Sequence, residues 1–170
     1  MKIEETEKIK FQDLFFFNSF IKNEVDVKIN EIIKNSSFIN GPDKFEFEEN
    51  FARFCDVKYC IGVGNCSDAL EICIEALNLP KESEIIVPSN SFIATSEAVT
   101  RSGHKVIFAD CNKDNYTISL NSIKNNINKN TSAIIAVHLY GHPCDIDQIK
   151  NLIKGKQIAI IEDCAQSHGA

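Results

Sequence analysis

Residues 62–68, with the sequence GVGNCSD, have the composition of a loop that binds phosphate. They follow a short apolar run and precede an amphipathic segment, so we expect them to open a helix. A helix N-terminus presents free N–H groups and the positive end of the helix dipole, and the Ser67 hydroxyl adds a donor. The segment resembles the dinucleotide fingerprint G-x-G-x-x-G, but it lacks the third glycine and the acidic residue expected at the end of the next strand. A capped helix after a tight turn is the alternative interpretation.

Three further positions favour a planar ligand that carries a positive charge. Asp163 directly follows an apolar run, where a carboxylate is partly desolvated and attracts a cation such as a protonated pyridine nitrogen. Gln166 comes three residues later and would reach the same ligand if the turn is tight. Phe92 follows another apolar run and could stack on a planar ring. Taken in isolation, Phe92 is better explained as an ordinary core residue.

Histidine spacing raises the question of a metal site. His138 and His142 are four residues apart, but Gly141 and Pro143 are incompatible with a regular helix there. A loop that lines a pocket is therefore the preferred interpretation of this segment. Residues 164–168 pair a cysteine and a histidine at the same spacing, within a run of small residues that favours a loop. We predict no metal site.

A regular scaffold is predicted from residue 58 onward, where continuous apolar runs alternate with amphipathic segments. Such runs are typical of parallel strands that are buried on both faces, so we expect an α/β domain with a mainly parallel sheet and helices on both faces. Ligands of such sheets bind outside the carboxyl ends of the strands, where the segments described above lie. The expected strands cover residues 59–63, 84–87, 105–109, 133–137 and 157–161, and the expected helices cover residues 67–77, 92–101, 120–127 and 145–153.

The preceding part of the chain has a different pattern. Residues 1–40 predict a helical lead-in segment, with a helix from Asn23 to about Asn35 whose apolar residues share one face. The dipeptide at residues 41–42, Gly-Pro, predicts a break in the chain after this helix. Asp43 is expected to cap a second helix that carries a phenylalanine stripe.

Composition excludes several classes of protein. Of the 170 residues, 44% are hydrophobic and 25% are charged, which is typical of one ordinary globular domain. The net charge of −6 and the lack of basic clusters argue against nucleic acid as a partner. No apolar run approaches the ~20 residues of a membrane helix, and the N-terminus does not resemble a signal peptide, so we expect a cytoplasmic protein with no membrane partner. The seven cysteines show no CxxC spacing, and we expect them to be reduced.

Taken together and in order, four of these segments resemble the DegT-type sugar aminotransferases. These are pyridoxal-phosphate enzymes of the aspartate-aminotransferase fold (fold type I) that aminate keto-sugars on a nucleotide carrier. The resemblance implies that residues 41–170 are the N-terminal portion of the large cofactor-binding domain, after a lead-in at residues 1–40. The segments that carry it are GVGNCSDAL (62–70), IVPSNSFIAT (86–95), VHLYGHP (137–143) and IEDCAQSHGA (161–170).

The resemblance also implies a role for each site residue. Cys66 and Ser67 would hold the phosphate of pyridoxal 5'-phosphate through backbone N–H groups and the Ser67 hydroxyl. Phe92 would stack on the pyridine ring, Asp163 would pair with the protonated ring nitrogen, and Gln166 would hydrogen-bond the phenolic oxygen. The family often has Gly-Thr where this chain has Cys66 and Ser67; serine keeps the hydroxyl, and cysteine is compatible with a negative φ.

The reaction that the resemblance implies is transfer of an amino group from glutamate to a nucleotide-linked keto-sugar, in polysaccharide or deoxyamino-sugar biosynthesis. No catalytic residue is assigned, because the family places its Schiff-base lysine, and then a C-terminal domain, beyond Ala170. We therefore expect the 170 residues alone to be inactive and the full-length enzyme to be a homodimer. Two alternatives remain open: a non-catalytic relative that acts as a binding or regulatory module, and a Rossmann-type NAD-dependent dehydrogenase.

Overall fold

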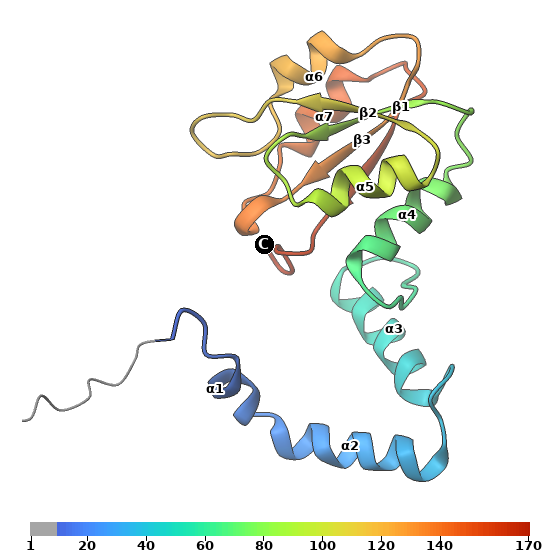
Figure 1. The fold of residues 1–170 in the computed structure, drawn as a ribbon, viewed down its shortest axis with the longest axis vertical. Coiled ribbons are helices and arrows are strands. Elements are labelled where there is room, and N and C mark those ends of the chain that lie inside the picture. Colours follow the sequence, from blue (N-terminus) through green and yellow to red (C-terminus); the bar gives the residue numbers. More distant parts are fainter. Residues whose placement is uncertain (1–9) are drawn as a thin grey trace, which may run out of the picture. The chain divides into compact units, whose positions relative to one another are not determined.

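The computed structural model describes residues 10–170, which form two compact units, one ending at Gly62 and the other spanning Val63–Ala170 (Figure 1). The candidate site residues all belong to the second unit. Within the described residues, no helix is both long and apolar enough to cross a membrane.

Helices dominate the described part of the first unit. The predicted helix at residues 23–35 is confirmed, but it begins one residue earlier, and its N-cap Ile21 makes no side-chain hydrogen bond. Asn23 therefore lies inside the helix and does not cap it. The second helix begins at Pro42, whose fixed φ suits the first helical position, so the prediction that Asp43 caps this helix is wrong. The three helices are α1 (Leu14–Ser19), α2 (Lys22–Asn35) and α3 (Pro42–Phe54).

The strand expected at residues 59–63 is absent, and this prediction was wrong: the segment is neither helix nor strand. Its backbone bonds to a side chain, because the Gly62 N–H donates to Glu48 Oε1 at 2.7 Å. Lys44 Nζ lies 2.8 Å from the same oxygen. The hydrogen bond from Lys44 lowers the pKa of the Glu48 carboxyl most, and the one from the Gly62 N–H lowers it further. A dinucleotide fingerprint requires a strand directly before its glycines, so the dehydrogenase alternative loses its structural basis.

Four parallel strands form the sheet of the second unit, in the order β2-β1-β3-β4. The other four predicted strands are confirmed to within two residues at each end. Because β1 and β3 are neighbours, the winding of the chain reverses between them, and α/β sheets bind ligands outside the carboxyl ends at such a switch point. The strands are β1 (Glu84–Pro88), β2 (Lys105–Ala109), β3 (Thr131–Val137) and β4 (Ala159–Asp163).

Helices cover both faces of this sheet, as predicted (Figure 1). On one face lie α4 (Cys66–Ala76) and α5 (Ile93–Arg101), and on the other lie α6 (Leu120–Asn126) and α7 (Ile146–Leu152). Along β1, Ile85 and Val87 pack in the layer of α4 and α5, whereas Ile86 packs in the opposite layer, and all three are fully buried. The two layers hold the strands in place and thereby fix the loops at their carboxyl ends.

Candidate functional site

One cavity of about 220 Å³ is lined by all five predicted site residues. It lies where the start of α4 meets the segments that follow β1, β3 and β4. The structure therefore brings together side chains that are up to 100 residues apart in the chain. Residues 137–139, at the end of β3, form part of its wall. The five predicted residues are Cys66, Ser67, Phe92, Asp163 and Gln166.

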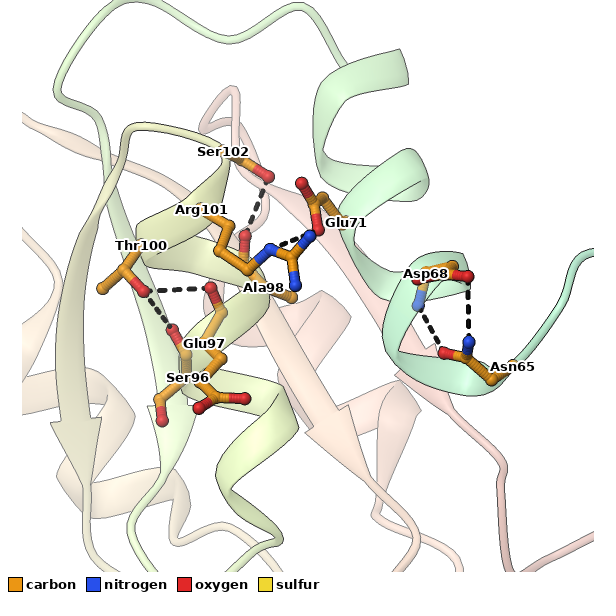
Figure 2. A network of polar contacts seen from close by, with 9 residues as sticks. All are labelled: Asn65, Asp68, Glu71, Ser96, Glu97, Ala98, Thr100, Arg101 and Ser102. Carbon is orange, nitrogen blue, oxygen red and sulfur yellow. Dashed lines mark hydrogen bonds and ion pairs between the residues drawn. The ribbon is translucent and has the colours of Figure 1, made fainter.

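The N-terminus of α4 is held by a reciprocal cap (Figure 2). Asn65 Oδ1 accepts from the Asp68 N–H at 2.9 Å, and Asn65 Nδ2 donates to Asp68 Oδ2 at 2.9 Å. Because Asn65 uses the N–H of Asp68, the N–H groups of Cys66 and Ser67 are the ones that the first turn offers to a ligand. Cys66 has helical backbone geometry, so a side chain is compatible with the position where the family often has glycine.

Asp163, the last residue of β4, is buried, with 9% of its surface exposed. Its Oδ1 accepts from the Ala165 N–H at 3.1 Å, and the Cys66 thiol lies 3.6 Å from the same oxygen. Both donors are neutral, so neither compensates the carboxylate charge. A desolvated carboxylate with neutral donors is complementary to a cation.

The Cys66 thiol faces this carboxylate. Partial desolvation of the thiol, followed by the negative charge and hydrogen bond of Asp163, raises the pKa of Cys66 from 9.0 to about 11. The thiol therefore stays protonated at neutral pH, where it acts as a hydrogen-bond donor and not as a nucleophile.

Gln166 and Phe92 complete the arrangement that the sequence predicted. The Tyr140 N–H donates to Gln166 Oε1 at 2.7 Å, which fixes the amide so that Nε2 is its remaining hydrogen-bonding group. Phe92 caps α5 and is 75% exposed, so the alternative that it is a core residue is wrong. Its ring is therefore accessible to a ligand that stacks on it.

Two further residues, His138 and Thr95, belong to the cavity wall. His138 is buried; its Nδ1 accepts from the Cys144 N–H at 2.9 Å, and its Nε2 lies 3.0 Å from Glu162 Oε2. Because Nδ1 accepts a hydrogen bond, the ring N–H lies on Nε2, which donates a hydrogen bond to Glu162. Thr95 is 1% exposed and lines the cavity, and it is not among the residues predicted from the sequence. Its position three residues after Phe92, on the first turn of the same helix, is the signal that could have identified it.

The histidine and cysteine pairs do not assemble into a chelating cluster. Among the residues that the structure describes, no group of three or more His, Cys, Asp or Glu side chains could hold a metal ion.

Comparison with known proteins places these observations in a family context. The sequence matches the DegT/DnrJ/EryC1/StrS aminotransferase family over residues 19–170. It is 38% identical over 162 residues to the dTDP-3-amino-3,6-dideoxy-alpha-D-galactopyranose transaminase of Aneurinibacillus thermoaerophilus, which covers 95% of this chain and 45% of the relative. It is 36% identical over 144 residues to the GDP-perosamine synthase of Escherichia coli O157:H7, covering 84% of this chain and 39% of the relative.

Solved structures agree with the sequence matches. The Streptomyces venezuelae protein DesV, solved in complex with a ketimine intermediate, superposes with a TM-score of 0.92 at 32% identity, over 96% of this chain and 44% of that one. A Bacillus subtilis protein with bound pyridoxamine phosphate (PMP) gives a TM-score of 0.89 at 30% identity, over 99% of this chain and 39% of that one. The predicted fold type is thereby confirmed.

The chain spans less than half the length of these relatives. Within that span, both the order of the sequence segments and the fold agree with the family. The chain therefore belongs to the DegT/DnrJ/EryC1/StrS aminotransferase family.

Proposed function

We propose that this chain forms the cofactor-binding part of a pyridoxal-phosphate-dependent aminotransferase that converts a nucleotide-linked keto-sugar to an amino sugar, with glutamate as the amino donor. The observation that carries the proposal is the convergence of a helix N-terminus, an exposed aromatic ring, a buried carboxylate and an oriented amide on one cavity. These four features match the phosphate, the ring face, the ring nitrogen and the phenolic oxygen of one molecule.

The phosphate end of the cofactor is assigned to α4. The backbone N–H groups of Cys66 and Ser67 and the Ser67 hydroxyl would donate to phosphate oxygens. The positive end of the helix dipole adds a favourable electrostatic contribution for an anion. The Asn65 cap keeps this turn intact and ties down the carboxylate of Asp68, which would otherwise be free to approach the phosphate.

The ring end is assigned to Asp163, Phe92 and Gln166. Pyridoxal 5'-phosphate, when bound, supplies an electron sink through which an amino group passes from one substrate to another. Asp163 would hold a proton on the ring nitrogen, because its buried carboxylate stabilises a positive charge beside it. Phe92 would stack on the ring and exclude water from one of its faces, and Gln166 would donate from Nε2 to the phenolic oxygen.

The substrate class comes from the relatives. Those described above are named for dTDP-linked and GDP-linked sugars, and one related structure holds a PLP-glutamate geminal diamine. By analogy, we assign a nucleotide-linked keto-sugar and glutamate to this protein. The Schiff-base lysine would lie in sequence beyond residue 170, in a cytoplasmic homodimer. The division into a lead-in at residues 1–40 and a partial large domain at residues 41–170 is part of the same proposal.

The experiment that tests the proposal uses the full-length gene product that contains residues 1–170. Purified protein is titrated with pyridoxal 5'-phosphate and then incubated with glutamate and a panel of dTDP-, UDP- and GDP-linked keto-sugars. We expect cofactor binding and the formation of 2-oxoglutarate together with an amino sugar. The Asp163→Ala variant serves as the control and should lose both the tight binding and the reaction.

Two outcomes would contradict the proposal in different ways. If the protein binds the cofactor and forms no amino sugar with any member of the panel, the non-catalytic alternative is favoured. If it binds no cofactor, the assignment of the cavity itself is wrong.

A further inference from the structure

The segment after β3, residues 138–141, is an unusual turn. Tyr140 has φ 55° and ψ 23°, in the left-handed region, and Gly141 follows with φ 85°. The left-handed conformation is unfavourable for a residue with a side chain, so the surroundings must favour it. A strained turn beside a cavity calls for a physical reason.

Two hydrogen bonds and one close backbone approach join this turn to the end of β4 and the segment that follows it. The His138 N–H donates to the Asp163 carbonyl at 3.1 Å. The Tyr140 N–H donates to the side-chain oxygen of Gln166 at 2.7 Å. A Cβ atom at Gly141 would lie only 3.2 Å from the Gln166 carbonyl oxygen, so the two backbones approach closely. The turn therefore contacts both the backbone and the side chain of Gln166.

The polarity of the second contact decides which way the Gln166 amide faces. A backbone N–H can only donate, so the atom that it meets must be the amide oxygen. The amide nitrogen is then the group of Gln166 that remains to serve a ligand in the cavity. Without the N–H of Tyr140 at that position, the amide could rotate and present an acceptor to the phenolic oxygen of the cofactor, which also needs a donor.

We propose that the Tyr140–Gly141 turn is a positioning element that fixes Gln166 as a hydrogen-bond donor to the ring oxygen of the cofactor. The inference rests on the proposed function, because it concerns the same cavity. It accounts for the strain at Tyr140, whose left-handed backbone aims the N–H at Gln166. It also accounts for glycine at position 141, where a side chain would displace the Gln166 backbone.

The test compares two glycines that share a left-handed backbone and differ in their surroundings. Gly103 has φ 76°, and a Cβ built on it meets nothing within 4 Å, so Gly103→Ala adds backbone strain alone. Gly141→Ala adds similar strain and a contact with Gln166. The probes are PMP, which binds without a covalent bond, and the same compound lacking the ring hydroxyl. Affinities are measured by equilibrium dialysis on the protein as its gene encodes it.

We expect Gly141→Ala to weaken binding of PMP about tenfold or more, the effect of one lost hydrogen bond to a charged group, while Gly103→Ala leaves it unchanged. Affinity for the analogue without the hydroxyl should be the same in both variants. If Gly141→Ala fails to fold, Gly141→Asn replaces it, because asparagine tolerates the left-handed region and still brings a Cβ against Gln166. In a Gln166→Leu background, either substitution at position 141 should add no further loss.

Different outcomes identify which idea fails. Equal effects of the Gly141 and Gly103 variants, or equal losses for the two probes, would overturn the positioning role while leaving the proposed function intact. If the unmodified protein does not bind PMP, the proposed function fails and the positioning role fails with it.

Discussion

Asn65 provides a direct test of the phosphate assignment, because its cap can be removed without touching any residue that lines the cavity. In Asn65→Ala, the Asp68 N–H loses its partner at 2.9 Å, and the Asp68 carboxylate loses the amide that holds it, also at 2.9 Å (Figure 2). The first turn of α4 then begins to fray. The two N–H groups assigned to the phosphate are in that turn.

The magnitude follows from the energy of a helix cap. Replacing an asparagine N-cap by alanine costs about 1 kcal/mol of stability, which in a domain of this size lowers Tm by roughly 2–8 °C. If the phosphate binds only to the intact turn, up to the same free energy is lost from binding, or up to about fivefold in affinity. Release of the Asp68 carboxylate beside the phosphate acts in the same direction.

Ser119→Ala is the matched control. Ser119 caps α6 by accepting from the Ser122 N–H at 3.3 Å, and α6 packs on the other face of the sheet from α4. Both variants are compared with the unmodified protein by thermal unfolding and by titration with PMP. We expect both to lose stability, and only Asn65→Ala to lose affinity.

The reasoning is refuted if Asn65→Ala is destabilised but binds PMP as tightly as the unmodified protein. It is equally refuted if Ser119→Ala loses as much affinity, because the loss would then report general destabilisation.

Three further predictions concern the ring site, the thiol and the core. Asp163→Asn keeps the shape and removes the charge, so affinity for PMP should fall tenfold or more with no drop in Tm; an unchanged affinity would argue against an ionic partner. The Cys66 thiol should contribute to the free energy of unfolding fully below pH 9 and progressively less as the pH rises from about 9 to about 11, because the unfolded chain loses this proton first. Chemical denaturation of the unmodified protein and of Cys66→Ser over that pH range measures the contribution. Parallel stability curves for the two proteins would contradict the prediction. Ile134→Ala, at a fully buried position of β3, should lower the free energy of unfolding by about 2–5 kcal/mol. Ile72→Ala, at a position on α4 that is 48% exposed, should lower it by about 0.5 kcal/mol. Equal losses in denaturant unfolding would show that the core is misassigned.

Much of the second unit could be predicted from local pattern. A strand buried on both faces must be apolar at every position, so β1 and β3 stand out as continuous runs. The segments that follow the strands carry the site residues, because only there can polar groups reach a ligand at the carboxyl edge. The four segments in order were enough to indicate the family, which the comparisons confirmed.

Local pattern failed where the partner of a backbone group was a side chain. Residues 59–63 have the composition of a strand, yet strand formation requires a neighbouring strand, and the Gly62 N–H instead bonds to Glu48. Similarly, α2 and α3 begin directly after the N-cap residues Ile21 and Gly41, and sequence propensity places such a helix start only to within a residue or two.

The sequence by itself determined the alternation of strands and helices, the fold class and the residue types at the strand ends, because burial imposes these choices one segment at a time. Only the tertiary structure decided the order of the strands and, with it, which loops meet. Cys66 and Asp163 are 97 residues apart in the chain, and their contact exists because β4 lies beside β3 and because α4 packs on that side of the sheet. The orientation of the Gln166 amide likewise depends on a second loop, since the Tyr140 N–H can only donate and therefore faces the amide oxygen.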